Sequence, residues 1–477
     1  MKHNCLKSEP VAVLIPNGIV NLEKAVSGTG LQPDRIRLIL EQIRLARLMS
    51  MSTSNWKKNT QFSQGWTSLH SKILIKAGTD EYSKYMTWLI ENKIIEVRKN
   101  ANGTKSYSVN GKSQQFRIAP EILKPINGKY FHREIITDYK TIKSVFLLKK
   151  YFGDKPIKKS SLVLTDIHHQ LIYMMSEVKF NMELFDKIRH TPDFFQSFTS
   201  DKLGMLDEYR ELMEAINEGE IKFATVDRFG ERLHTPYSNL WGTLRKFIYF
   251  KNSPNDSLVV LDFANSQPYF SSVCTSTKFI EEILPEFINC IPIITNANTT
   301  DDFSSFVRMC SDGTIYDFWS TARGIKRENA KEEIINIIMF GKPKSTLAVI
   351  RKTRKIFGAH FPSVLKMFDQ IKTTNADDLP FIKTLYIDKQ NNFTGRKDLY
   401  KNLSCMMQRA ESRMVIGKIA PALIKAGLVP FITVHDSFIV LQQHEEKVRK
   451  VIQEEFEKLV VQPPKVKSTK IFVPLGK

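Results

Sequence analysis

Two apolar segments that each carry an aspartate place the strongest constraint on how this chain can fold. Leu258-Val259-Val260-Leu261 is an uninterrupted apolar run that ends at Asp262, a pattern typical of a buried strand. Residues 431–440 are predicted to form two short strands joined at His435-Asp436, which places that aspartate at a hairpin apex. A carboxylate at the end of a buried strand is costly unless a cation or another partner offsets its charge.

The two aspartates are far apart in the sequence and can meet only through the fold. If they meet, their oxygens form a site suited to Mg²⁺. Two ions bridged by carboxylates stabilise both the attacking and the leaving oxygen in phosphoryl transfer. We therefore expect two Mg²⁺ ions held by Asp262 and Asp436. The alternative is that both are ordinary strand-terminal aspartates.

A cationic helix is predicted between these segments. Arg327 and Lys331 lie one turn apart on the same face, and the helix continues through apolar residues to Phe340-Gly341. The positive face can hold a triphosphate, and Lys331 can neutralise or protonate a leaving pyrophosphate. An ordinary amphipathic helix is the alternative when this segment is considered alone.

The charge balance indicates a polyanionic partner. Seventy Lys and Arg residues against 50 Asp and Glu leave a net charge of +20, which most often marks a nucleic-acid-binding protein. Solubility or association with ribosomes is the alternative. The apolar share of 42% and the charged share of 25% are ordinary globular values, so the chain as a whole is not disordered, collagen-like or a coiled coil.

The cysteines and apolar runs predict a soluble protein of the cytoplasm. Five cysteines show no paired spacing, which argues against a disulfide framework or a zinc site and fits a reducing compartment. No apolar run approaches the ~20 residues that span a bilayer, and the first ten residues lack the apolar core of a secretory signal. We expect no membrane partner.

Residues 66–120 are predicted to form a compact module of two helices and basic hairpins. The helices cover 69–76 and 80–92, and a change to a period of two follows from Ile94 to Ile118. This order resembles a winged helix-turn-helix, in which a helix enters a groove and the hairpin touches phosphates. Basic residues occur on or near the hairpins: Lys99, Lys105, Lys112 and Arg117. A structural module or a protein-contact role is the alternative.

Together these segments resemble the palm and fingers of family A (bacterial polymerase I-like) DNA polymerases and of the related single-subunit, phage-type RNA polymerases. The matching positions are Asp262 for motif A, Arg327 and Lys331 for the Arg-x-x-x-Lys of motif B with the aromatic-Gly pair Phe340-Gly341, and His435-Asp436 for motif C. The stretch Asp227 to Leu233, with Asn239-Leu240 and Arg245, is similar to the segment before motif A. Gln408 and Glu411 resemble polar residues that face the minor groove of the primer-template. The resemblance covers about residues 220–445.

The chain also departs from the family pattern. Asn265-Ser266-Gln267-Pro268 replaces the usual Ser-Gln-Ile-Glu run, and the spacing from Lys331 to Phe340 is one residue longer than usual. Gln267 occupies the position of the family's glutamate that excludes the 2′-hydroxyl. Gln267 is similarly bulky, which favours deoxynucleotides, whereas Asp436-Ser437-Phe438 resembles the RNA polymerases.

The resemblance implies an α+β, right-hand polymerase with a palm built on an antiparallel sheet and helical fingers and thumb, preceded by the winged-helix-like module. The predicted divisions are an N-terminal segment 1–65, the DNA-binding module 66–125, a thumb-like or linker region 126–220, and palm and fingers 221–477.

The implied function is a template-dependent nucleotidyltransferase, favoured as a DNA-directed DNA polymerase acting on a DNA template-primer and nucleoside triphosphates. A single-subunit RNA polymerase or primase-like enzyme is the first alternative, and a non-catalytic DNA-binding replication initiator is the second. The expected residues are Asp262, Asp436 and Lys331 for catalysis, Arg327, Gln267, Phe340 and His435 for the substrate, and Arg232, Arg245 and Gln408 for the nucleic acid.

Overall fold

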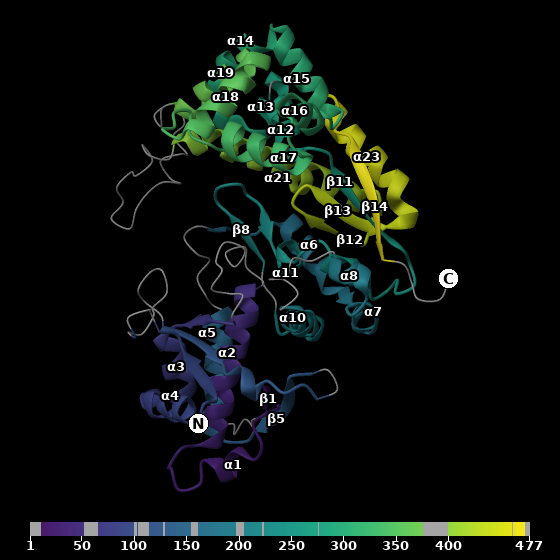
Figure 1. The fold of residues 1–477 in the computed structure, drawn as a ribbon. Helices are drawn as coiled ribbons and strands as arrows, with labels where there is room; N and C mark the ends of the chain where they lie inside the picture. Colours follow the sequence, from purple (N-terminus) through teal and green to yellow (C-terminus); the bar gives the residue numbers. More distant parts are fainter. Residues whose placement is uncertain are drawn as a thin grey trace, which may run out of the picture. The chain divides into compact units, whose positions relative to one another are not determined.

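The computed structural model describes residues 11–51, 65–99, 103, 114–126, 129–153, 161–196, 205–221, 224–274, 276–374, 399–459 and 461–472. Packing divides the chain into two compact units, the first formed by 1–156 with 182–222 and the second by 157–181 with 223–477. Helices alternate with small antiparallel sheets in a mixed α+β fold, as predicted (Figure 1).

The first unit begins with a strand and ends with a long helix. Its elements are β1 (Val11–Pro16), α1 (Leu22–Ala25), α2 (Pro33–Met51), β2 (Thr67–Leu69), α3 (Ser71–Gly78), α4 (Tyr82–Glu91), β3 (Ile95–Val97), β4 (Gln114–Ile118), the 3₁₀ turn η3 (Pro120–Ile122), β5 (Phe131–Ile136), α5 (Tyr139–Gly153), α7 (Met182–Ile188), α8 (Pro192–Gln196) and α10 (Leu206–Glu218).

The two helices expected within 66–120 are present, as are strands near both ends of 94–118, and the strand expected at 106–109 lies outside the described residues. Tyr85, Met86 and Leu89 of α4 are buried, as their helical spacing predicts. Strands β3 and β4 pair antiparallel, and β2 joins the other side of β4, so that the sheet order is β2-β4-β3. Lys105 and Lys112 lie outside the described residues. The identification as a winged helix-turn-helix stays a prediction.

The core of the first unit extends beyond this module. One apolar cluster joins Leu89 of α4 to Ile39 of α2, Ile15 of β1 and Ile142 of α5. Segments before and after 66–125 therefore share its core, because three short strands and two helices offer too little apolar surface to form an independent core. Any separate function of 66–125, and the thumb-like role of 126–220, stay predictions.

The second unit contains the sheet that carries both aspartates. Up to that sheet's first strand its elements are β6 (Ser161–Leu162), α6 (Asp166–Ser176), β7 (Val178–Phe180), β8 (Thr225–Asp227), β9 (Leu233–His234), α11 (Pro236–Asn239), η4 (Leu244–Phe247), β10 (Ile248–Phe250) and β11 (Leu258–Phe263). The helical segments that follow are α12 (Ser266–Val273), α13 (Thr277–Ile283), η5 (Pro285–Cys290), α14 (Ile291–Asn298), α15 (Asp301–Ser311), α16 (Ile315–Arg323), α17 (Arg327–Glu332), the π-helix η6 (Glu333–Met339), α18 (Ala348–His360), α19 (Pro362–Thr373), η8 (Leu399–Lys401), α21 (Asn402–Ser412), the π-helix η9 (Arg413–Ile419) and α22 (Ala420–Lys425). The chain ends with β12 (Phe431–Val434), β13 (Ser437–Leu441), η10 (Gln442–His444), α23 (Glu445–Glu457) and β14 (Val466–Phe472).

The four-stranded sheet of the second unit is antiparallel, with the order β12-β13-β11-β14. Helix α23 packs beside it, and the ring of Phe456 on this helix lies 5.8 Å from that of Phe263. Helices α14, α15, α18 and α19 gather at the far end of the unit from β14, with α12, α17 and α21 between them and the sheet (Figure 1). The apolar run 258–261 lies within β11 and forms the buried strand that its composition predicts.

None of the helices that the structure describes has the length and apolar character required to cross a bilayer. The four described cysteines, Cys274, Cys290, Cys310 and Cys405, are buried free thiols.

Candidate active site on the antiparallel sheet

Asp262 and Asp436 lie on neighbouring strand ends. Asp262 of β11 pairs with Ser437 of β13, the residue directly after Asp436. The backbone N–H of Phe263 donates to the carbonyl of Asp436 over 3.3 Å. Two residues distant in the sequence thus meet at one end of the two inner strands of the sheet.

His435 occupies the first position of the two-residue turn between β12 and β13, with φ of +55°. This left-handed conformation favours glycine in such hairpins and costs other residues on the order of 1 kcal/mol. Its ring lies 6.0 Å from that of His234, edge to face. The backbone strain thus lies at the residue directly before Asp436, and the substrate contact expected of His435 stays a prediction.

The electrostatics of the two aspartates differ. Burial raises the pKa of Asp262, while the nearby cations Lys331, Lys467 and Arg245 act to lower it. Burial, together with the charges of Glu411 and Asp262, raises the pKa of Asp436 to about 8. Negative charge at Asp436 is therefore unfavourable in the protein alone.

Glu411 on α21 is buried and fully hydrogen-bonded. Its Oε1 accepts from Nε and Nη2 of Arg232, at 2.9 and 2.5 Å. Its Oε2 accepts from the Ser266 hydroxyl at 2.7 Å and from Nε2 of Gln267 at 2.5 Å. The family resemblance implies that Glu411 faces an open groove, but the residue is only 1% exposed. Its two oxygens instead accept hydrogen bonds that connect α12 and Arg232 to α21.

The cationic helix has an unusual second half. Lys331 is exposed and forms no hydrogen bond or ion pair with any described residue, whereas Arg327 pairs with Asp317 at 2.8 Å. After α17 the helix widens into η6, and the N–H of Phe340 donates to Ile335 at 2.8 Å. A π-helical turn accommodates an additional residue, which accounts for the longer spacing between Lys331 and Phe340.

Backbone hydrogen bonds connect the end of β11 to the segment before β14, and that segment to the end of α15. The N–H of Ala264 donates to Lys465 at 2.9 Å, and the N–H of Lys465 donates to Ser311 at 3.0 Å. Gly313, at φ +75°, lies so close that an added Cβ would approach the Cβ of Ala264 to 2.8 Å. Glycine is therefore required where the turn before α16 crosses the end of β11.

Arg245 and Gln408 occupy different surroundings. Nη1 of Arg245 donates to the carbonyl of Leu240 at 3.2 Å, and the charges of Asp262 and Asp436 both act on its guanidinium. Gln408 packs against Gly230, where an added Cβ would lie 2.6 Å from its Oε1. Arg245 thus belongs to the aspartate site, and Gln408 to the contact of α21 with the 227–232 loop.

Gln267 is held in place by its bond to Glu411. Its Oε1 is buried and has no hydrogen-bond partner among the described residues. Phe340 is half-buried after the π-helix, and its proximity to Gln267 stays a prediction.

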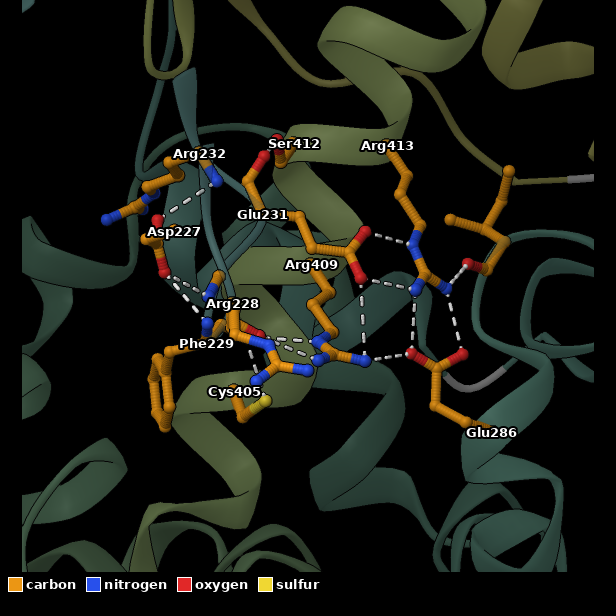
Figure 2. A network of polar contacts seen from close by, with 12 residues as sticks. Asp227, Arg228, Phe229, Glu231, Arg232, Glu286, Cys405, Arg409, Ser412 and Arg413 are labelled. Carbon is orange, nitrogen blue, oxygen red and sulfur yellow. Dashed lines mark hydrogen bonds and ion pairs between the residues drawn. The ribbon is translucent and has the colours of Figure 1, made fainter. Parts of the chain in front are cut away.

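A network of two arginines and two glutamates holds the 227–232 loop against α21 (Figure 2). Arg413 pairs with Glu231 at 2.7 Å and with Glu286 at 2.8 Å. Arg409 pairs with Glu286 at 2.6 Å and donates to the carbonyls of Phe229 and Arg228. The network fixes the loop that leads into Arg232.

The donor set fits magnesium. Mg²⁺ is usually bound through one or two carboxylates plus substrate phosphates and keeps several waters. Asp262 and Asp436 supply two adjacent carboxylates, and because burial raises the pKa of Asp436, a bound cation would stabilise its charged form. Within the part of the chain that the structure describes, no group of three or more His, Cys, Asp or Glu forms a metal site. Asp262 and Asp436 are the side chains that would hold the ion.

The raised pKa of Asp436 predicts a pH-dependent stability. In EDTA, the folded protein keeps a proton on Asp436 between pH 4 and about 8, whereas the unfolded chain loses it near pH 4. The free energy of unfolding should therefore fall as pH rises through this range. Asp436→Asn should weaken this dependence and raise the free energy of unfolding at pH 8 by roughly 1–3 kcal/mol, measured by urea denaturation. An identical pH dependence in Asp436→Asn would contradict the assignment.

Several residues of the site were missed at the sequence level. Lys467 of β14 lies opposite Asp262 of β11, beyond the segment that resembles a known family. Arg409, Arg413 and Glu286 form no motif of their own. The basic alternation within 465–470 was the available signal for Lys467, and no local signal distinguishes the network arginines from exposed ones.

No family model and no curated protein matches this chain. Among solved structures, the chain is similar to the POL domain of Pol1 from M. smegmatis, described in complex with DNA primer-template and dNTP. The identity is 13%, the TM-score is 0.30, and the match covers 68% of this chain and 59% of that one. At so low a TM-score, the function has to be argued from the site itself.

Proposed function

We propose that this chain is a template-dependent nucleotidyltransferase, and specifically a DNA-directed DNA polymerase. The observation that carries the proposal is the meeting of Asp262 and Asp436 at one end of the inner strands β11 and β13, where the charges of several cations act on Asp262. Paired carboxylates beside an excess of cations suit a reaction on a polyphosphate. In this proposal the sheet is the palm and the helical region from α12 to α19 the fingers.

The chain's own residues would bind and orient the reactants. Bound Mg²⁺ would supply Lewis-acid stabilisation of the attacking and leaving oxygens. The primer's 3′-oxygen bonds to the α-phosphorus while the bond to the β-phosphate oxygen breaks, the electron pair stays on pyrophosphate, and the hydroxyl proton passes to water. Lys331 places positive charge where pyrophosphate develops its negative charge, and Arg327 extends the cationic face of α17.

Residues around the sheet would position the nucleic acid. Arg245 lies beside both aspartates, where it can hold a backbone phosphate near the reacting ends. Arg232 donates to Glu411 through Nε and Nη2, so Nη1 and the second N–H of Nη2 remain for a phosphate. Gln408 and His435 are proposed contacts to the primer-template and to the nucleotide.

An RNA polymerase remains the second candidate because of Gln267. The buried Oε1 of this amide has no partner among the described residues and can accept a hydrogen bond from a ribose 2′-hydroxyl. In the DNA polymerase proposal the same side chain excludes that hydroxyl by its bulk. The fixed position of the amide is compatible with both roles.

A primer-extension assay tests the function. Purified protein, a primed DNA template and Mg²⁺ are supplied with either four deoxynucleoside or four ribonucleoside triphosphates. We expect template-directed extension with deoxynucleotides that stops on addition of EDTA. Preference for ribonucleotides would select the RNA polymerase. Duplex binding without extension by either set would indicate a replication initiator.

The 66–125 module is proposed to bind duplex DNA. Lys93 and Lys99 are exposed two residues before and two residues after β3, where the hairpin would contact phosphates. In the full chain, replacing both with glutamine should reduce the slope of log K against log salt by about 1.8. Replacing the exposed Lys24 of α1 is the control and should change little. An unchanged slope in the double variant would assign the module to protein contacts.

A further inference from the structure

More than one cation acts on the carboxylate of Asp262. Three cations, Lys331, Lys467 and Arg245, act on this carboxylate. Glu411, the third carboxylate nearby, is already paired with Arg232. Three cations therefore face two aspartates, a surplus that suits an additional anion.

Lys467 is the least expected of these cations because it comes from the edge strand β14. It lies directly opposite Asp262 in the β11–β14 pair, and residues opposite each other in an antiparallel pair project from the same face. On the other side of Asp262 stands Ser437, whose hydroxyl donates to the Val434 carbonyl at 2.9 Å. Lys467 is thus the charged cross-strand neighbour of Asp262.

The ammonium of Lys467 is available to a ligand. The side chain is exposed, and among the described residues it forms no ion pair within 4.0 Å, with Asp262 or any other carboxylate. A simple cross-strand ion pair therefore does not explain its presence. Lysines on edge strands also discourage pairing with other chains, a role that Lys470 on the same strand can fill equally well.

We propose that Lys467 binds the β- and γ-phosphates of the incoming nucleotide, together with Lys331. Both lysines act on Asp262, whereas Asp436 interacts with the charges of Arg232 and Arg245. One lysine reaches the site from the cationic helix and the other from the sheet edge, so a polyphosphate between them is held from two sides. This inference rests on the proposed nucleotidyltransferase function and deepens it.

Lys470 provides a matched control on the same strand. It is exposed, and its charge acts on Glu445 of α23. Ser468, two residues before Lys470, also bonds to Glu445, so these even-numbered positions face away from Asp262. Neutralising Lys470 changes the net charge of β14 by the same amount as neutralising Lys467. It removes no positive charge from the aspartate site.

The first experiment measures binding of inorganic tripolyphosphate to the full chain by calorimetry, without metal and without DNA. Lys467→Met should weaken this binding by about tenfold, Lys331→Met should weaken it similarly, and Lys470→Met should leave it unchanged. The second experiment measures the KM for nucleotide and the Kd for primer-template. Lys467→Met should raise the KM and leave the Kd unchanged, and thermal denaturation verifies that each variant is folded.

Two results would overturn the inference while leaving the proposed function intact. In the first, the wild type extends primers, and Lys467→Met and Lys470→Met bind tripolyphosphate equally well. Lys467 would then only protect the edge strand from pairing with other chains. A loss of primer-template affinity with unchanged tripolyphosphate binding would assign Lys467 to the nucleic-acid backbone. A wild-type protein that neither extends primers nor binds tripolyphosphate would refute both proposals.

Discussion

Asp262→Asn should lower the rate of primer extension by at least about 10³-fold. The substitution keeps the size of the side chain and removes the charge that would hold Mg²⁺ against the reacting phosphate. Because burial raises the pKa of Asp262, its replacement should not destabilise the fold. Single-turnover extension of a labelled primer gives the rate, and fluorescence anisotropy with the same duplex gives the Kd, which should change less than threefold.

The control for this variant is Asp256→Asn. Asp256 lies just before β11, in the turn in which its N–H donates to the carbonyl of Ser253. It carries the same charge, but it is remote from the strand end that holds Asp262, so its replacement should leave the rate nearly unchanged. If Asp262→Asn retains extension within tenfold of the wild type, the paired aspartates are not the reactive site.

Arg409→Met should lower the free energy of unfolding by about 3–5 kcal/mol, the cost of removing one partner from a buried ion pair. Arg409 is largely buried, and its guanidinium bonds to Glu286 and to the carbonyls of Arg228 and Phe229. Removing it leaves these acceptors buried with fewer donors, and an unmet buried acceptor is costly. Urea denaturation followed by circular dichroism measures the change.

A surface ion pair of the same helical segment provides the control. Lys418 of η9 pairs with Glu282 over 3.7 Å, and both side chains are about two-fifths exposed. Lys418→Met should cost less than about 1 kcal/mol. Arg409→Met should also slow extension, because the loop that leads into Arg232 loses its attachment to α21. Equal stability losses in the two variants would contradict the importance of the network shown in Figure 2.

The local patterns of the sequence determined the elements that carry the candidate chemistry. The apolar run before Asp262 forms β11, and the hairpin around His435-Asp436 forms β12 and β13. The helix with Arg327 and Lys331 is present as well. Such elements can be predicted because the burial of neighbouring residues and the geometry of a two-residue turn are encoded over only a few positions.

Only the tertiary structure decided which charges remain available at the site. Glu411 resembles a groove-facing residue in sequence, yet it is buried by bonds to Arg232, Ser266 and Gln267. Lys467 resembles any edge lysine until the pairing of β14 with β11 places it opposite Asp262. Cross-strand register and ion-pair choice join residues far apart in the chain, and no local pattern records which partners the fold brings together.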